Sequence, residues 1–355
     1  LQGSSYIFLK NMDESTNICK VDLNAFQIDK PTIIARSSSE KQIRHFEILK
    51  DKLIFTRIKN GTQAFLYEIL NDGRESEIKL PYQAGTIKID NQSINSNNLW
   101  ATIDGWTKSS TRFSVNSANE LSKIQFGAST SYVEFDDIIS EQIELESHDG
   151  QLVPLTILRK ENIQYNSKNK TLIEAYGAYG FMLEPYFSPM HLDWIKNGGV
   201  LAYAHVRGGG EKGVKWHEDG RKEKKSNSWK DLLACANYLI NQKITNPKKL
   251  GLFASSAGGI TAGMSLNTNP ELFSAFVATS PRLNPVRLEF SKSTSSSFME
   301  YGSIKNKDEA KFLIAMDPYL NLSPEQIYPP TLLISGFKDD RIPISDTGKF
   351  IARLQ

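Results

Sequence analysis

One short segment, residues 252–259 with the sequence LFASSAGG, restricts the fold of this chain more than any other. An apolar stretch runs into a group of small residues, and a helical pattern follows at residues 260–266. This order predicts a buried strand, a sharp turn and a helix. A turn of this kind lifts the side chain at its apex out of the sheet, which is how some hydrolases expose a nucleophilic serine.

The turn also decides which of two adjacent serines is the candidate nucleophile. Its geometry crowds the positions two before and two after the apex, so both must carry small side chains. For Ser256 these positions are Ala254 and Gly258, whereas Ser255 would place Phe253 in the crowded site. We therefore predict that Ser256 is the nucleophile, with alanine in place of the more usual first glycine.

The start of the helix behind Ser256 adds a second chemical feature. Backbone N–H groups at a helix N-terminus have no partner within the helix and carry the positive end of its dipole. The N–H of Ala257 is therefore a natural donor to an oxyanion formed at the serine. The segment alone leaves open that it is only a Ser/Gly-rich turn before a buried helix.

Strands and helices alternate from about residue 140 to the end of the chain. The strand candidates are short and apolar without alternation, as is typical of strands buried on both faces; they lie at residues 171–176, 200–206, 250–255, 275–279 and 331–335. The clearest helical pattern covers residues 229–240, with Ser228 as a candidate N-cap and Asp231 completing a capping box. The alternation predicts a mostly parallel, doubly wound sheet with helices on both faces.

The candidate acid follows the last predicted strand, in the sequence TLLISGFKDDR at residues 331–341. In α/β hydrolases the catalytic residues follow the chain order serine, acid, histidine. Asp339 lies 83 residues after Ser256, in the position expected for an acid that orients the histidine and stabilises its charged form. A plain surface turn is the alternative interpretation.

No histidine follows Asp339. The chain order therefore excludes all five histidines from the triad, and we expect them to be surface or packing residues; they are His45, His148, His191, His205 and His217. Gln355 is only 16 residues beyond Asp339. We expect the catalytic domain, residues 140–355, to be truncated before its histidine; a protein without a catalytic base is the alternative.

Residues 1–139 have a different sequence pattern, in which short apolar runs repeat. Apolar strand-like runs begin at Tyr6, Leu53 and Leu99, with spacings of 47 and 46 residues. A second run follows each of them, near Asn17, Ala64 and Thr111. A period in the forties with internal hairpins predicts blades of a β-propeller; an irregular β-sandwich is the alternative. We expect about three blades, with more blades upstream of Leu1, because closed propellers need about four to eight.

Composition excludes several classes of protein. No stretch approaches the roughly 18 uninterrupted apolar residues of a membrane span, and a net charge of +2 gives no reason to expect a nucleic-acid partner. We interpret the basic run RKEKK at residues 221–225 as a solvated loop. The two cysteines, Cys19 and Cys235, show no metal-ligand spacing and predict no disulfide framework, and Cys235 falls in a core pattern.

The run GGGEKG at residues 208–213 matches the glycine pattern of dinucleotide sites. Such a site requires a helix that opens at once and an acidic residue about 20 positions later. The following sequence predicts no such helix, so we do not expect a nucleotide. No metal or other cofactor is implied.

Several motifs in order give the chain a resemblance to the prolyl oligopeptidase family of serine peptidases (peptidase family S9). The motifs are YGAYG at 176–180, HVRGGGE at 205–211, the Ser256 turn and DDR at 339–341. The resemblance implies an α/β-hydrolase domain and a partial all-β propeller. It further implies Ser256 as nucleophile, Asp339 as acid, Tyr176 and the Ala257 N–H as the oxyanion hole, and Arg341 as a contact to the peptide substrate.

Substrate specificity stays open. Prolyl-specific members of the family stack a tryptophan on the proline ring, but residues 295–300 read SSSFME, which leaves Phe298 as the candidate substitute. Members selective for basic residues line the pocket with acidic groups. Glu289 and Glu300 are candidates for that role, unless they pair with Arg282 and Arg287.

The sequence thus predicts a serine-type endopeptidase that hydrolyses short peptides through an acyl-enzyme. The alternatives are another α/β hydrolase, either an esterase or an aminopeptidase-like enzyme, and a non-catalytic peptide-binding scaffold. Without the histidine, residues 1–355 alone should be inactive. The sequence predicts a soluble protein and decides neither between cytoplasm and periplasm nor the oligomeric state.

Overall fold

The structure is a computed structural model. It describes residues 5–12, 15–24, 30–38, 40–91, 93–125, 135–290 and 295–355, without the side chain of residue 295. The chain divides into two compact units. The first contains residues 1–136, 184–188 and 211–215, and the second contains residues 137–183, 189–210 and 216–355.

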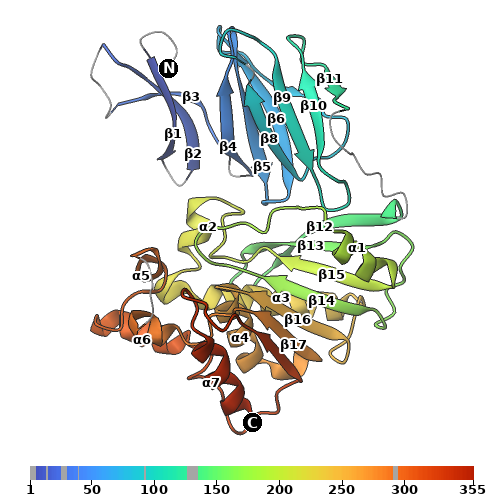
Figure 1. Cartoon of the computed structure of the whole chain (residues 1–355), viewed down its shortest axis with the longest axis vertical. Helices are drawn as coiled ribbons and strands as arrows, with labels where there is room; N and C mark the ends of the chain where they lie inside the picture. The colour runs from blue at the N-terminus through green and yellow to red at the C-terminus, as the bar shows by residue number, and fades with distance from the viewer. Residues whose placement is uncertain are drawn as a thin grey trace. The chain divides into compact units, whose positions relative to one another are not determined.

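Three antiparallel sheets build the first unit (Figure 1). The first sheet contains β1 (Ser5–Met12), β2 (Ser15–Asp22) and β3 (Thr32–Ala35). The second contains β4 (Lys41–Ile48), β5 (Lys52–Lys59), β6 (Gln63–Leu70) and β7 (Glu75–Ile78). The third contains β8 (Thr86–Asn91), β9 (Leu99–Asp104), β10 (Thr111–Val115) and β11 (Leu121–Lys123).

The repeated runs of the sequence form one hairpin in each of these sheets. The pairs are β1–β2, β5–β6 and β9–β10, so the predicted repeat is confirmed. Apolar faces of successive sheets share cores. Ile18 of the first sheet and Phe55 of the second belong to one cluster, and Leu66 of the second and Ala101 of the third belong to another. Each sheet therefore buries apolar side chains against its neighbour, as propeller blades do.

The second unit is a single seven-stranded sheet covered by helices. The strand order is β12-β13-β15-β14-β16-β17-β18. The strands are β12 (Ile138–Glu146), β13 (Leu152–Lys160), β14 (Lys170–Ala175), β15 (Gly199–Ala204), β16 (Leu250–Ser255), β17 (Ala275–Thr279) and β18 (Thr331–Ile334). The five predicted strands are confirmed as β14 to β18, which pair in parallel. The antiparallel hairpin β12–β13, which extends the sheet beyond β15, was not predicted.

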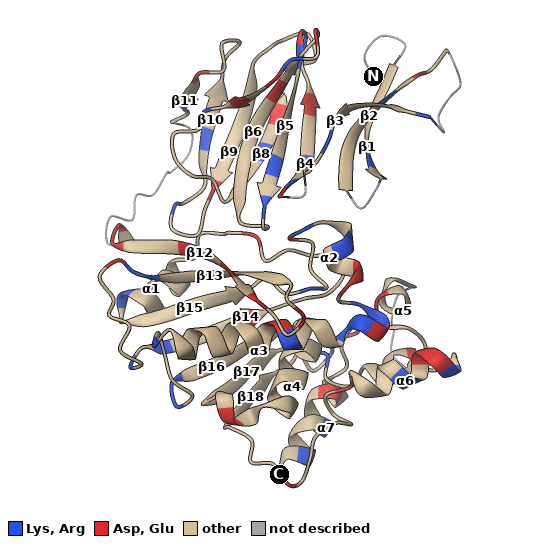
Figure 2. Cartoon of the chain, turned by 180° about the vertical axis from the view of Figure 1, so that it is seen from behind, with Lys and Arg blue, Asp and Glu red and all other residues tan. Residues whose placement is uncertain are grey.

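Helices lie on both faces of this sheet. Figure 1 shows α1 (Pro189–Lys196) on the near face, and Figure 2, from behind, shows α3 (Ser226–Asn241) and α4 (Gly258–Thr268) on the other. The remaining helices are α2 (Val214–Glu218), α5 (Ser295–Tyr301), α6 (Lys307–Ala315) and α7 (Ile344–Leu354). The sheet is therefore mostly parallel and doubly wound, as predicted.

The predicted cap of α3 is wrong. The helix begins at Ser226, and its N-cap residue Lys225 makes no side-chain cap. Ser228 and Asp231 lie inside the helix and are fully buried. Tertiary contacts replace the capping box, because the Ser228 hydroxyl donates to the carbonyl oxygen of Arg207 at 2.6 Å.

The interpretation of the basic run as a solvated loop is also wrong at one position, since Lys225 is only 1% exposed. The other three cations of the run pair with carboxylates: Arg221 with Glu218, Lys222 with Glu309 and Lys224 with Asp219. Figure 2 shows basic and acidic residues interspersed along the elements of this unit. The run is therefore mostly neutralised by its neighbours.

Three further observations concern the described residues. Neither cysteine forms a disulfide, and Cys235 is buried in the core as predicted. No group of three or more His, Cys, Asp or Glu side chains in the described ranges has an arrangement that could hold a metal ion. Within these same ranges, every helix is too short or too polar to traverse a lipid bilayer.

Candidate active site

The turn between β16 and α4 is strained at Ser256. This residue has φ = +50°, in the left-handed region that non-glycine residues rarely adopt. Its backbone N–H donates to the carbonyl oxygen of Thr279 at 3.0 Å, and its own carbonyl accepts from Gly259 at 3.1 Å. The serine is thus held between the end of a parallel strand pair and the first helical turn. Strain of this kind is typical of functional sites.

The positions around Ser256 are crowded as the sequence argument requires. A Cβ atom on Gly258 would lie 2.7 Å from the carbonyl oxygen of Ala175, and Ala254 is completely buried. The main chain of β14 therefore passes directly against the start of α4. This contact leaves room for glycine only and explains why Ser256 is the apex of the turn.

Tyr176 comes from the end of β14 and meets the serine side chain. A side-chain hydrogen bond links its phenol to Ser256, and burial raises the pKa of the phenol above its ordinary value. Tyr176 therefore keeps its proton at neutral pH and can donate it in a hydrogen bond. The N–H of Ala257 lies just before the first hydrogen bonds of the helix, which Gly259 and Ile260 donate. Both predicted oxyanion donors thus lie beside Ser256.

Asp339 lies in the loop after β18 and is held by backbone groups. Its Oδ1 accepts from the N–H groups of Arg341 at 2.9 Å and Ile342 at 3.0 Å. These bonds, together with a hydrogen bond from the side chain of Ser280, lower the pKa of the Asp339 carboxyl. The carboxylate is therefore charged at neutral pH and fixed in direction, as an acid that orients a histidine must be.

Arg282 connects the serine turn to the acid loop. Its backbone N–H donates to the Ser256 carbonyl oxygen, and its guanidinium donates to the Arg341 carbonyl oxygen, both at 2.8 Å. Asp346 lies 4.0 Å from the same guanidinium, and burial raises the pKa of Asp346 to about 6. The pattern around Arg282 suggests only an ion pair with a glutamate, and nothing in the neighbouring sequence indicates its contact to the acid loop.

A pocket of about 410 Å³ opens beside the serine. Its lining contains four of the six predicted site residues and three aromatic rings. The lining residues are Tyr176, Tyr179, Phe181, Ser256, Ala257, Arg282, Ser296, Ser297, Arg341 and Ile342. Asp339 adjoins this set through its bonds to the backbones of Arg341 and Ile342.

The structure does not bring Phe298, the sixth predicted residue, to this pocket. Phe298 packs against the hydrophobic core of its unit. The pocket instead holds Phe181, whose side chain is exposed and whose ring lies 6.2 Å from Tyr176 and 6.3 Å from Tyr179. Sequence reasoning missed Phe181 although it directly follows the YGAYG run.

Glu289 and Glu300, the acidic candidates for the pocket, are not among its lining residues and have other partners than the two arginines. Glu300 is buried and lies 2.7 Å from His217 Nε2, and Glu289 lies 3.2 Å from Lys305. Arg287 stacks over the ring of Phe290. The alternative, in which Arg282 and Arg287 pair with these glutamates, is therefore wrong.

The glycines of residues 208–210 serve loop packing. Gly208 has φ = +97°, and a Cβ there would lie 2.1 Å from the carbonyl oxygen of Gly177. A Cβ on Gly210 would lie 2.2 Å from the carbonyl oxygen of Gly180, whose N–H donates to Gly208 at 3.0 Å. The loop that begins with Tyr176 thus packs backbone to backbone against residues 208–210, which explains the glycines without a nucleotide.

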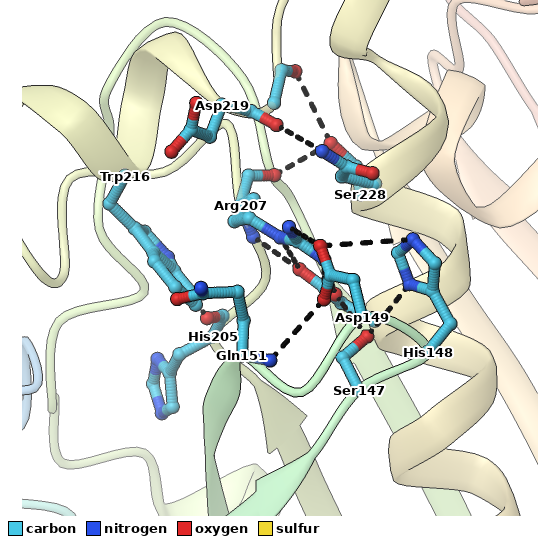
Figure 3. Close-up of polar contacts among 12 residues, drawn as sticks. Ser147, His148, Asp149, Gln151, His205, Arg207, Trp216, Asp219 and Ser228 are labelled. Atoms are coloured by element: carbon cyan, nitrogen blue, oxygen red, sulfur yellow. Dashed lines mark hydrogen bonds and ion pairs between the residues drawn. The ribbon is translucent and has the colours of Figure 1, made fainter.

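A buried arginine anchors this glycine loop (Figure 3). The Arg207 guanidinium donates to Asp231 at 2.7 and 2.9 Å and to Asp149 at 2.5 and 3.1 Å. Its backbone N–H also donates to Asp231 at 3.0 Å, and the Ser147 hydroxyl donates to the same carboxylate at 2.5 Å. These carboxylates raise the pKa of Arg207. The network joins α3, the β12–β13 turn and the glycine loop.

The fold and the strained serine define an α/β hydrolase, and comparisons with known proteins specify the family. Residues 185–355 match the model of the prolyl oligopeptidase family. An uncharacterized peptidase of Rickettsia prowazekii is 33% identical over 90% of this chain and 45% of its own length. A prolyl endopeptidase of Elizabethkingia miricola is 31% identical over 62% of this chain and 31% of its own length.

A solved prolyl endopeptidase structure superposes on 98% of this chain and 53% of its own, with a TM-score of 0.86 and 25% identity. The chain belongs to the prolyl oligopeptidase family of serine peptidases, with an α/β-hydrolase domain and β-propeller sheets. It spans about half the length of the curated relatives that match most of it.

Proposed function

We propose that this chain carries the nucleophile, the acid and the oxyanion donors of an oligopeptidase that hydrolyses internal bonds of short peptides. The observation that carries the proposal is the left-handed conformation of Ser256, which presents its hydroxyl to the Tyr176 phenol at the mouth of a pocket. Membership of a peptidase family supports a peptide bond as the bond cleaved.

The proposed reaction is acyl transfer. An imidazole from outside residues 1–355 lies between Asp339 and Ser256 and takes the serine proton as the hydroxyl attacks a peptide carbonyl. Tyr176 and the Ala257 N–H donate to the oxyanion of the tetrahedral intermediate. The amine leaves with the proton from the imidazole, and water then hydrolyses the acyl-enzyme.

The pocket favours proline or another apolar residue before the cleaved bond. Three aromatic rings, from Tyr176, Tyr179 and Phe181, line it, and among its described lining residues there is no carboxylate. A basic side chain would lack a counter-ion there. Arg341 is exposed at the rim and is our candidate for the contact to a substrate carbonyl.

The test uses a polypeptide that contains residues 1–355 together with the segment that provides the catalytic histidine. Matched chromogenic substrates ending in Pro, Phe or Arg, and an ester of the proline acid, are assayed side by side. We expect the proline amide to be hydrolysed best, and Ser256→Ala to lower kcat by about 10³-fold or more. Preference for the ester favours an esterase, and no hydrolysis of any substrate favours a binding scaffold.

Residues 1–355 alone supply an internal control for the role of the histidine. This polypeptide should hydrolyse none of the substrates and should react with a fluorophosphonate no faster than its Ser256→Ala variant. Rapid labelling at Ser256 in the absence of an added histidine would contradict the proposed mechanism, because it would show that the serine is activated by another base.

A further inference from the structure

Lys225 is a buried cation beneath the loop that carries Tyr176. The residue is the N-cap of α3 and is 1% exposed. Burial lowers the pKa of its ammonium to about 8, and attraction from Glu300 opposes this shift. Burying a charge without a carboxylate in direct contact is costly, so the position calls for an explanation beyond packing.

The ammonium of Lys225 donates a hydrogen bond to one particular atom, the carbonyl oxygen of Gly177. Gly177 directly follows Tyr176 and has φ = +64°. A Cβ on Gly177 would lie 2.6 Å from the side chain of Val206. Gly177 is therefore closely confined by its neighbours, and Lys225 binds its carbonyl oxygen.

Neighbouring contacts fix the rest of the same loop. Thr261 of α4 donates to the Tyr176 carbonyl oxygen at 3.2 Å. Ser228, one helical turn after Lys225, donates to Arg207 at 2.6 Å and thereby holds the glycine loop that packs on Gly177 (Figure 3). The first turn of α3 thus binds the carbonyls of both loops. The Gly177 carbonyl accepts from the Lys225 ammonium and, at 3.5 Å, from the Ser228 hydroxyl.

We propose that Lys225 is a positioning residue, whose ammonium holds the Gly177 carbonyl and so aims the Tyr176 hydroxyl at the oxyanion formed at Ser256. The effect of Lys225 on catalysis rests on the proposed function. Its effect on the order of residues 176–180 does not, and can be measured without any activity. An oxyanion donor must be preorganised to stabilise a transition state, and the ammonium provides that order through the Gly177 carbonyl, without itself lining the pocket beside Ser256.

The first experiment uses residues 1–355 and needs no catalysis. Hydrogen exchange is measured by mass spectrometry in Lys225→Met, with Lys230→Met as the matched control on the exposed side of α3. We expect amides of residues 176–180 to exchange about tenfold faster in Lys225→Met, while the β-propeller sheets exchange as in the parent. Unchanged exchange at 176–180 overturns the proposal.

The second experiment is a double-mutant cycle in the histidine-containing form. Lys225→Met should lower kcat by about 10- to 100-fold with KM nearly unchanged. In a Tyr176→Phe background the same substitution should lower kcat by less than about threefold, because the two residues act through one hydroxyl. Fully additive effects overturn the proposal.

Two controls keep the outcomes distinct. If Ser256→Ala abolishes activity while Lys225→Met leaves kcat intact, the inference about Lys225 fails and the proposed function stands. If Lys225→Met does not fold, Lys225→Leu, which also lacks a side-chain N–H donor, takes its place in the exchange experiment. Exchange at 176–180 equal to the parent in that variant again counts against a positioning role.

Discussion

The backbone N–H of Arg282 donates a hydrogen bond of 2.8 Å to the carbonyl oxygen of Ser256. The guanidinium of the same residue donates to the Arg341 carbonyl oxygen in the acid loop. One buried residue therefore links two loops that come from different strands of the sheet. The imidazole of the proposed mechanism must fit between these loops.

Arg282→Met should destabilise the protein in a pH-dependent way. Burial already raises the pKa of Asp346 to about 6 from 3.8, and loss of the nearby cation should raise it further. A raised pKa in the folded state means that stability present below about pH 4 is lost as the pH rises through the folded-state value. We expect a loss of about 2–4 kcal/mol at pH 8 and a much smaller loss at pH 4–5.

Urea unfolding at the two pH values measures this effect. Asp346→Asn in the Arg282→Met background removes the unpaired carboxylate and should recover most of the loss at pH 8. A double variant as unstable as the single one would show that the carboxylate is not the cause.

Gly258→Ala should distort the serine turn. The added methyl group would lie 2.7 Å from the Ala175 carbonyl oxygen. The backbone of a central strand cannot move away without breaking hydrogen bonds of the sheet. We expect a loss of about 1–3 kcal/mol in the free energy of unfolding, measured by urea denaturation. Gly348→Ala is the matched control, because that helical glycine has open space around it and alanine should stabilise the helix by about 0.5–1 kcal/mol. Equal effects at both sites would contradict the crowding argument.

The two carboxylates that bind Arg207 should differ in their contribution to stability. Asp231 is completely buried, whereas the Asp149 side chain is 37% exposed. We expect Asp231→Asn to lower the free energy of unfolding by about 2–4 kcal/mol, since it removes a negative charge that compensates the buried guanidinium. Asp149→Asn should lower it by about 1 kcal/mol or less. Chemical denaturation of the two single variants provides the comparison, and the reverse order would refute this account of the network.

Glu174→Gln should stabilise the protein at high pH only. The Glu174 carboxyl lies in an apolar hollow beside Leu172, Trp194 and Phe253, and burial raises its pKa to about 7 from 4.5. The folded state therefore disfavours the charged form, and this penalty grows as the pH rises from about 4.5 through 7. We expect a gain of up to about 3 kcal/mol at pH 8 and none at pH 4.

Thermal and urea unfolding across this range test the expectation for Glu174. Glu146→Gln, at an exposed position of β12, is the control and should change little at any pH. A gain from Glu174→Gln that does not depend on pH would point to altered packing instead of the carboxyl charge.

Sequence reasoning was most successful where the signal is local. The turn at Ser256 could be located because the chain itself supplies the strand, the small residues and the helix within about a dozen positions. The five parallel strands and the repeated hairpins were likewise visible as short apolar runs. Local reasoning failed at Ser228 and Asp231, which look like a capping box and are in fact buried contacts to Arg207.

Steric crowding acts between residues close along the chain, so the amino-acid sequence is enough to show which serine can be the apex of the turn. The places of Phe181 in the pocket and Phe298 against the core emerge only when the chain is folded. So does the burial of a lysine from a charged run under the Gly177 carbonyl. The physical reason is that these outcomes depend on which loops from different strands pack together, and no periodicity along the chain encodes that packing.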